Sequence, residues 1–338
     1  MSEAIEIEDL VKIYPGGAVA VDKLSLAVHS GEIFGLLGPN GSGKTTTVRI
    51  LVTLLRPTSG TVRVGGLDVE RFTHEVRRSI GYAAQFIGVD EDMTARENLV
   101  LMGRLHGLSA AQAARRAEEL LDVMSMGSMA DMRTGRFSGG MRRRIDLLQA
   151  LVHRPPILFL DEPTTGMDPQ SRIALWQYLH RLKRDGMTIL LTTQYLEEAD
   201  RACDRIAIID EGRPLRTGSP AALKEELGAD RITLTLDSAL TEDTYQRAAQ
   251  IVAKCPEVTR VEQVEPLVLA TREAGTSLPE VIRQIEAERI QIRTIRSSAV
   301  TLDDVFLRYT GHKVRTEVRR ENPMNALFAA IHGKGPQH

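Results

Sequence analysis

The feature that most constrains this chain is the stretch Leu36–Ile50, where an apolar strand runs into a glycine loop and the loop runs into a helix. Its residues Gly38, Gly43, Lys44 and Thr45 fit GxxxxGK followed by Ser or Thr, the spacing of a phosphate-binding loop. Glycine permits turns that leave backbone N–H groups bare, and a helix start favours an anion. A chance glycine turn is the alternative, but strand, loop and helix follow the order that the motif demands. We therefore predict that the loop binds ATP, with Lys44 as a cation and Thr45 as a ligand of Mg²⁺.

Composition limits the classes of protein to which the chain can belong. Its 338 residues are enough for about two domains. The composition, with 42% hydrophobic and 26% charged residues, is ordinary for a globular protein. A net charge of −2 gives no sign of nucleic-acid binding, so no nucleic-acid partner is expected. Cys203 and Cys255 lack metal-site spacing and indicate a reduced, cytosolic protein. The acidic N-terminus is not a signal segment, and no apolar run approaches the ~20 residues that span a bilayer, so any membrane role must come through a partner.

Local patterns predict a layered α/β arrangement. Short strands and turns in residues 5–65 predict a small antiparallel sheet beside the phosphate loop. Residues 157–162 and 188–193 are predicted strands of the buried type, typical of a parallel sheet, and residues 80–85 and 204–210 are predicted as further short strands. Between the strands at 80–85 and 157–162, Thr94 with Glu97 and Ser109 with Gln112 fit the capping-box pattern, which predicts a helix after each pair.

Two further stretches carry polar groups that suit a nucleotide. Ser138, Gly139 and Gly140 precede an apolar helical run and give a second helix start that can receive an anion. Asp161 and Glu162 end a strand of the buried type, and ligands of open α/β sheets bind at the carboxyl ends of strands. These two acids suit a partner for Mg²⁺ and a base for water.

The run Arg142, Arg143 and Arg144 follows the second helix start. It can be interpreted as a basic patch for nucleic acid. Solvated or paired side chains on the first helical turns are the favoured interpretation.

The composition changes near residue 228. Alternating strand and helix patterns over residues 231–295 predict an α+β unit with no phosphate loop of its own. Thr301 with Asp304 predicts the cap of one more short helix, which runs through Tyr309. The remaining polar residues contain one apolar patch, Met324–Ile331, which is too short to cross a membrane.

Several motifs occur in one order along the chain: the loop at 38–46, Gln85, Ser138 to Gly140, the acidic strand 157–162, Asp168 and position 194. With this set the chain resembles the ATP-binding cassette (ABC) ATPases over residues 4–225. The stretches FSGGMRRRIDL, LDEPTTGMDP, TTQYLEEAD and TLDDVFLRYTG are similar to the daunorubicin/doxorubicin resistance ATP-binding type, a drug-exporter branch of that family.

The resemblance implies the fold and its division into domains. The fold class is α/β: a P-loop NTPase (RecA-like) core with an antiparallel β subdomain and a helical subdomain, followed by a small α+β C-terminal domain. The expected limits are an ABC nucleotide-binding domain over residues 1–228, with its helical subdomain at about 86–155, a C-terminal extension over 229–311 and a polar tail over 312–338.

The resemblance also implies roles for individual residues. Tyr14 matches the aromatic residue that stacks on adenine, although its position alone leaves packing on a strand open. Gln85 matches the glutamine that senses Mg²⁺ and the attacking water, Asp161 the acid that supports Mg²⁺, and Glu162 the catalytic base. Asp168 matches the loop that joins two halves of a dimer. The residues that match the phosphate loop are Gly38, Asn40, Gly41, Ser42, Gly43, Lys44, Thr45 and Thr46. Those that match the signature, which touches the nucleotide of a second copy, are Ser138, Gly139 and Gly140.

Two departures from the family pattern bear on activity. Most relatives have Leu and Gln where this chain has Phe137 and Met141, which puts one hydrogen bond to the opposing nucleotide in doubt. Relatives usually have His at position 194, where it reaches the γ-phosphate. Gln194 can donate and accept hydrogen bonds but carries no charge. We expect Gln194, Glu162 and Lys44 to be catalytic and hydrolysis to be slow but real.

The function implied by the resemblance is that of the ATP-hydrolysing subunit of an ABC exporter. Its cofactors would be ATP and Mg²⁺, and it would drive efflux of a hydrophobic drug, antibiotic or lipid-like substrate. One phosphate loop and one signature per chain imply a head-to-tail homodimer. An integral ABC-2-type permease would hold the dimer at the cytoplasmic face of the cell membrane as a peripheral protein.

Two alternatives remain at this point. A soluble ABC ATPase acting on ribosomes or DNA usually has tandem cassettes or a long coiled-coil insertion, and this chain has neither. A small-molecule kinase could use the phosphate loop, but it would not need the Ser138 to Gly140 signature or Gln85.

Overall fold

The central sheet has the strand order β10-β9-β3-β8-β7-β6 in the computed structural model, which describes residues 2–227, 230–237, 242–272 and 274–310. Strands β9, β3, β8, β7 and β6 are parallel to one another, whereas β10 is an edge strand that pairs antiparallel with β9. The strands are β3 Ile33–Leu37, β6 Ile80–Ala83, β7 Ile157–Asp161, β8 Thr188–Thr193, β9 Arg205–Asp210 and β10 Arg213–Gly218.

Helices cover the central sheet because its inner strands are apolar on both faces. Every residue of β3, β7 and β8 is buried. Phe34 and Leu36 belong to one core cluster and Ile33 and Leu37 to another, as alternate side chains of a strand point to opposite faces. The parallel strands were therefore predictable as continuous apolar runs. The edge strand β10 was not predicted, because RPLRTG contains Pro and Gly and lacks that pattern.

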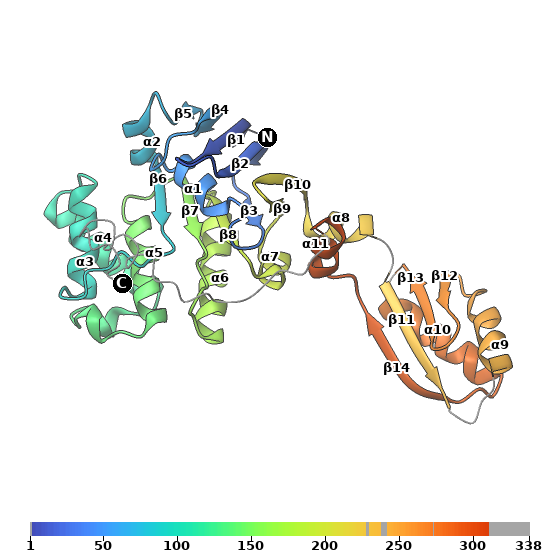
Figure 1. The fold of residues 1–338 in the computed structure, drawn as a ribbon. Helices are drawn as coiled ribbons and strands as arrows, with labels where there is room; N and C mark the ends of the chain where they lie inside the picture. Colours follow the sequence, from blue (N-terminus) through green and yellow to red (C-terminus); the bar gives the residue numbers. More distant parts are fainter. Residues whose placement is uncertain (1, 228–229, 238–241, 273, 311–338) are drawn as a thin grey trace, which may run out of the picture.

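The N-terminal strands form a separate antiparallel sheet, as predicted, with the order β2-β1-β4-β5. Its strands are β1 Glu3–Ile13, β2 Val19–His29, β4 Ser59–Val64 and β5 Leu67–Asp68. Apolar residues of this sheet share one core cluster with α1 and with one face of the central sheet. This cluster fixes the antiparallel sheet beside the phosphate loop (Figure 1).

The opposite face of the central sheet packs against helices in a second cluster. The helices of this part of the chain are α1 Lys44–Leu51, α2 Thr73–Ser79, α3 Ala95–Leu105, α4 Ala110–Val123, α5 Gly139–Leu151, α6 Pro169–Arg184, α7 Leu196–Ala202 and α8 Pro220–Leu227. Short 3₁₀ turns lie at Gly127–Met129 and Thr134–Arg136. The capping boxes at Thr94 and Ser109 start α3 and α4, as predicted.

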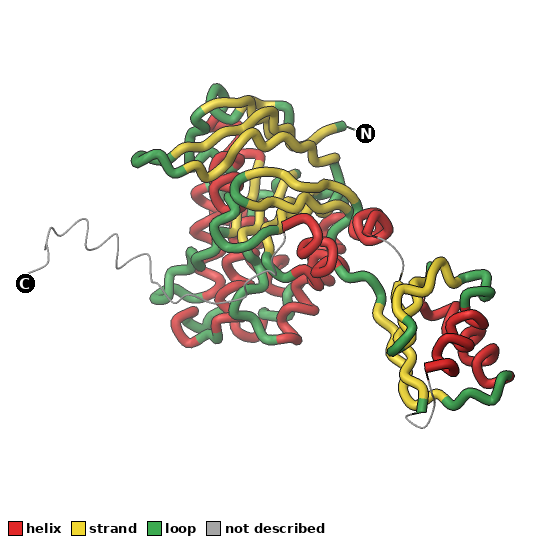
Figure 2. The backbone as a smooth tube through the Cα atoms, turned by 45° about the vertical axis from the view of Figure 1, so that its right-hand side comes forward, coloured by secondary structure: helices red, strands yellow, loops and turns green. Residues whose placement is uncertain are grey.

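Residues 230–298 form a βαββαβ unit of the ferredoxin-like type with its own core. The antiparallel strand order is β12-β13-β11-β14. Figure 2 shows this sheet with helices along it, apart from the larger group of elements. The elements are β11 Asp230–Leu236, α9 Glu242–Val252, β12 Val258–Gln263, β13 Leu267–Thr271, α10 Ala274–Ala287 and β14 Ile292–Ser298.

The next helix, α11 (Leu302–Thr310), packs on α7 and α8 (Figure 1). Leu302, Val305 and Phe306 join the core cluster beneath the central sheet. Thr301 Oγ1 accepts from the Asp304 N–H at 3.2 Å, which is the cap that the sequence predicts. The domain limits at 228/229 and 311/312 stay predictions, and the tail 312–338 with its patch Met324–Ile331 lies outside the described residues.

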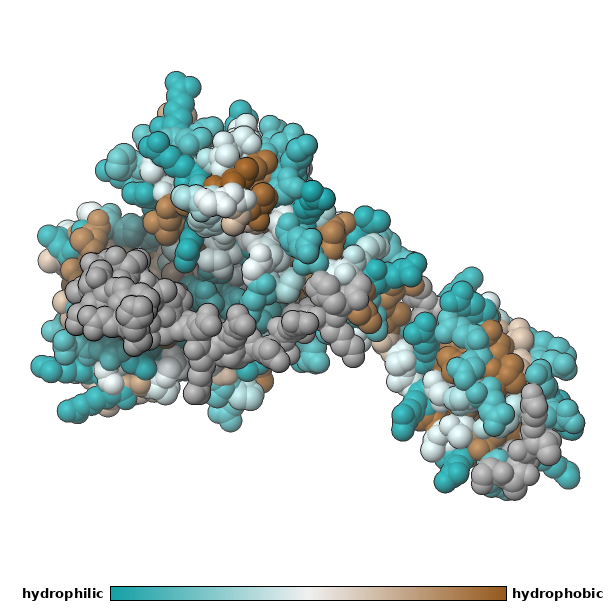
Figure 3. Space-filling model, in the orientation of Figure 1, coloured by the Kyte–Doolittle hydropathy of each residue, from teal (hydrophilic) through white to brown (hydrophobic). Residues whose placement is uncertain are grey.

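On the face shown in Figure 3, hydrophilic residues cover most of the surface and apolar residues gather in small patches. None of the described helices combines the length and the hydrophobicity that a bilayer crossing requires.

Replacing Phe306 with Ala tests whether α11 is part of the core. Phe306 is 0% exposed, so the cavity should lower the free energy of unfolding by about 3–5 kcal/mol in urea denaturation. Leu307→Ala on the same helix is the matched control, because Leu307 is 38% exposed and should change it by about 0.5 kcal/mol or less. Equal stability of the two variants would contradict the packing of α11 on α7 and α8.

Candidate active site

The phosphate loop lies between β3 and α1, and its glycines are required by close contacts. A Cβ at Gly38 would come within 2.2 Å of the Ile209 carbonyl oxygen, and one at Gly43 within 2.4 Å of the Ala20 carbonyl oxygen. Gly43 also has a φ of +100°, which disfavours any residue with a side chain. The loop backbone is therefore held where its N–H groups precede a helix start.

Lys44 opens α1 with its side chain buried inside this loop. It is 4% exposed, and its Nζ donates to the carbonyl oxygens of Gly38 at 2.7 Å and Pro39 at 2.8 Å. Burial lowers the pKa of the Lys44 ammonium, and the nearby carboxylates of Glu162 and Asp161 act in the opposite direction. These hydrogen-bond partners are neutral oxygens, which an anionic phosphate can replace.

Asp161 ends β7 and is fully buried, with polar neighbours from two other elements. Its Oδ1 accepts from Thr192 Oγ1 at 2.5 Å and from Thr45 Oγ1 at 3.2 Å. Its Oδ2 is buried and has no hydrogen-bond partner among the described residues. Mg²⁺ binds carboxylate oxygens. The buried Oδ2 of Asp161, on the carboxylate that also bonds the Thr45 hydroxyl, therefore fits this ion.

Glu162 follows Asp161 in a strained conformation and faces Gln85. Its φ is +48°, and such non-glycine conformations cost about 1–3 kcal/mol and cluster at functional sites. Its Oε2 accepts from Gln85 Nε2 at 3.2 Å and from Thr165 Oγ1 at 3.3 Å, while its backbone N–H donates to Thr192. The carboxylate is thus held at the edge of the sheet where the phosphate loop begins.

Two other predicted residues lie near this site. Gln194 directly follows β8, and its Oε1 is buried without a hydrogen-bond partner in the described part of the chain. Tyr14 lies beside the loop, with its hydroxyl 3.4 Å from Thr46 Oγ1. The ring is half-buried and adjoins the phosphate loop, which leaves it accessible to a base.

The signature residues lie elsewhere, at the start of α5. Ser138 caps this helix by accepting from the Met141 N–H at 3.2 Å, and both Ser138 and Gly139 are exposed. A Cβ at Gly140 would lie 3.4 Å from Asp168 Oδ2, so the signature packs on the turn that opens α6. Within the described residues, no hydrogen bond joins 138–140 to the phosphate loop.

One arginine differs from its expected environment. Arg143 is paired, as the sequence favours, but it is 5% exposed rather than solvated. Its guanidinium donates to backbone carbonyls behind Glu162 and to Asp146. Thr192, the partner of Asp161, was not predicted from the sequence. Pairing the runs 157–162 and 188–193 in parallel would have indicated it, because Asp161 and Thr192 are register partners.

Comparison with known proteins agrees with the geometry. Residues 21–165 match the family model "ABC transporter", and residues 218–310 match "ATP-binding protein DrrA1-3-like, C-terminal domain". The daunorubicin/doxorubicin resistance ATP-binding protein DrrA of Streptomyces peucetius is 43% identical over 92% of this chain and 93% of its own length. The Nod factor export ATP-binding protein I of Paraburkholderia xenovorans is 40% identical over 92% of this chain and 98% of its own.

Solved structures show the same cassette fold. An ATP-binding subunit of an ABC transporter superposes with a TM-score of 0.61 at 29% identity, over 66% of this chain and 92% of that one. The dimeric cassette MJ0796 with ADP and Pi superposes with a TM-score of 0.59 at 27% identity, over 64% of this chain and 98% of that one. Given its identity to such relatives over nearly its whole length, the chain belongs to the ATP-binding proteins of ABC transporters, of the daunorubicin/doxorubicin resistance type.

Proposed function

We propose that the chain is the ATP-hydrolysing subunit of an ABC exporter that drives efflux of a hydrophobic drug, antibiotic or lipid-like substrate. The observation that carries the proposal is the Glu162 carboxylate, held by Gln85 at the sheet edge that also presents Lys44 and Asp161. Relatives named for drug resistance and for Nod factor export support the direction of transport. They do not favour a soluble ABC ATPase acting on ribosomes or DNA.

In this proposal the phosphate loop binds the ATP phosphates and Tyr14 stacks on the adenine. Lys44 exchanges its carbonyl partners for phosphate oxygens, which are better partners because they carry negative charge and the carbonyl oxygens are neutral. Thr45 and Asp161 would hold Mg²⁺, and Gln85, which donates to Glu162, would sense the ion and the attacking water. When bound, Mg²⁺ neutralises the charge that develops on the transferred phosphoryl group.

Glu162 acts as the base that orients water. The hydrogen bonds from Gln85 and Thr165 both end on Oε2, so neither of them occupies the other oxygen, Oε1. Gln194, at the end of the next strand, hydrogen-bonds the γ-phosphate through its amide. Positioning and charge stabilisation account for most of the rate in reactions of this kind.

The active form is a head-to-tail homodimer. Ser138 and Gly139 are exposed at a helix start that can receive an anion, and they make no hydrogen bond to the phosphate loop in the described chain. A second copy can supply such a helix start to the bound nucleotide. Asp168, packed under Gly140, lies where the two copies would meet.

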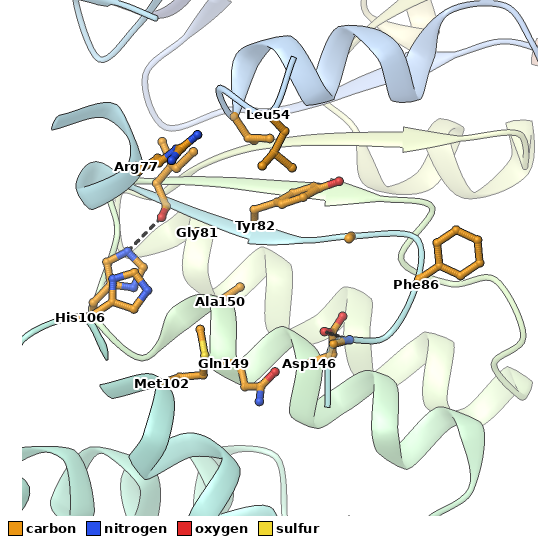
Figure 4. Close-up of a pocket in the computed structure, with 15 residues that line it drawn as sticks. Leu54, Arg77, Gly81, Tyr82, Phe86, Met102, His106, Asp146, Gln149 and Ala150 are labelled. Atoms are coloured by element: carbon orange, nitrogen blue, oxygen red, sulfur yellow. Dashed lines mark hydrogen bonds between the residues drawn. The ribbon is translucent and has the colours of Figure 1, made fainter. Parts of the chain in front are cut away.

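A membrane permease of the ABC-2 type would dock in a hollow of about 440 Å³ between β6, α3 and α5. Figure 4 shows Phe86, Met102, His106 and Asp146 around it, and Phe86 is 60% exposed at its side. An apolar hollow beside the Gln85 segment suits a short helix or loop of the permease. This contact would hold the chain at the cytoplasmic face of the membrane.

Glu162→Gln is the main test of the hydrolytic role. The amide keeps the size of the side chain and still accepts from Gln85 and Thr165, but it cannot act as a base. Hydrolysis should fall by about 10²- to 10⁴-fold, with ATP affinity kept and an ATP-bound dimer trapped on size-exclusion chromatography with Mg²⁺. Glu197→Gln, at an exposed position, is the matched control. Hydrolysis at the wild-type rate by Glu162→Gln would rule out the assignment.

Gln194→His should keep or raise the hydrolysis rate, because imidazole can donate to the γ-phosphate and can also carry positive charge. Gln194→Ala, which removes the hydrogen bond, should lower it. Both are measured as kcat for ATP at saturating Mg²⁺. Loss of turnover in Gln194→His would mean that the amide itself has a specific role.

Phe86→Glu tests the permease hollow. The charge should reduce co-sedimentation of the chain with membranes of its native cell and reduce export of a hydrophobic drug that wild-type cells expel, while ATPase activity of the isolated chain stays within about twofold of wild type. Ile173→Glu on α6 is the control, because Ile173 is equally exposed, at 59%, but lies outside this hollow. Unchanged sedimentation and export in Phe86→Glu would exclude the hollow as the docking site.

A further inference from the structure

Two charged side chains on α5 are buried behind the candidate active site. Arg143 is 5% exposed and Asp146 is 6% exposed. They lie three residues apart on one face of the helix, with Arg143 Nη1 3.0 Å from Asp146 Oδ2. A buried ion pair adds little stability over well-packed apolar residues. The role of this pair is therefore sought in the other hydrogen bonds that Arg143 and Asp146 make.

The pair holds both ends of the segment that carries Gln85. Arg143 Nη1 donates to the Ala84 carbonyl oxygen, just before Gln85. Asp146 Oδ1 accepts from the Gly88 N–H at 2.9 Å, just after it. Figure 4 shows Asp146 on α5 close to the chain that leads to Phe86. The glutamine therefore sits on a short arch whose two ends are fixed to the same helix.

The same guanidinium holds the backbone around Glu162. Arg143 Nη2 donates to the carbonyl oxygens of Asp161 at 2.9 Å and Glu162 at 3.4 Å, and Nε donates to that of Pro163 at 3.2 Å. Glu162 has a φ of +48°, and strained conformations persist only where the surroundings determine them. The hydrogen bonds from Arg143 to the neighbouring carbonyl oxygens hold the backbone of Glu162 in this conformation.

We propose that Arg143, with Asp146, is a positioning residue for hydrolysis: it fixes Gln85 and Glu162 relative to each other and to the signature helix α5. The inference rests on the proposed hydrolytic role of Glu162. The geometry requires arginine, because its planar fork presents five donors in fixed directions. Lysine offers one compact ammonium, which can keep the charge pair with Asp146 but cannot reach the carbonyls on both sides.

Arg143→Lys and Arg143→Met test the proposal, with Arg142→Met as the matched control. Arg142 is the neighbouring arginine on the same helix, and its partner is the exposed Glu91. In the full-length chain, kcat should fall by about 10- to 100-fold in both Arg143 variants, while KM for ATP changes by less than about threefold. Arg142→Met should stay within about twofold of wild type for both constants. A purely structural role would instead lower stability and leave kcat per folded molecule unchanged.

Hydrogen exchange gives a second readout that needs no turnover. Amides in residues 84–88 and 161–165 should exchange faster in Arg143→Lys than in wild type, and those in Arg142→Met should not. Asp146→Asn keeps an acceptor for the Gly88 N–H but loses the ion pair, so it should show an intermediate loss of kcat. It also stands in for Arg143→Met if that variant does not fold.

The outcomes separate the two proposals. Unchanged exchange in both segments, or a kcat within about twofold of wild type in Arg143→Lys, would overturn the positioning role. Absence of ATP hydrolysis by the wild-type chain would overturn the proposed function alone, because the exchange measurement still decides whether Arg143 holds the two segments.

Discussion

The rest of the site depends on the hydrogen bonds of the buried Asp161 carboxylate. A carboxylate in a dry interior is costly unless it is hydrogen-bonded or bound to a metal. Here Thr192 reaches it from β8 and Thr45 from α1, so the strand register and the position of the phosphate loop must both be correct. The other oxygen, Oδ2, has no hydrogen-bond partner among the described residues. The same hydrogen bonds that satisfy the carboxylate therefore bring the phosphate loop and the acidic strand together.

A second constraint comes from α5, a single helix that carries the signature, Arg143 and Asp146. Its start carries the signature, of which Ser138 and Gly139 are exposed, and its second turn carries Arg143 behind the acidic strand. Asp146, one turn later, lines the hollow proposed for the permease. One helix therefore joins the signature, the backbone around Glu162 and the hollow proposed for the permease.

Much of the fold could be predicted from the sequence, and the reasons are local. Strands such as β7 and β8 are continuous apolar runs, and the helices after Thr94 and Ser109 begin with capping boxes. Features that depend on distant partners were not predictable in this way. The edge strand β10 has little intrinsic pattern, and Arg143 lies in a run of arginines for which the sequence favours solvated or paired side chains. Its burial follows only from the carbonyls that surround it.

The sequence by itself determined the chemistry: glycines where the loop must turn, Lys44 and two acids after apolar strands, and one signature per chain. These signals are local because they depend on backbone conformation and on the alternation of side chains. Only the tertiary structure decided which of these groups meet. It places Gln85 against Glu162, packs the signature on Asp168 instead of the phosphate loop, and returns α11 to α7 and α8. Such contacts depend on strand order and on the packing of elements far apart in the chain, which no local pattern specifies.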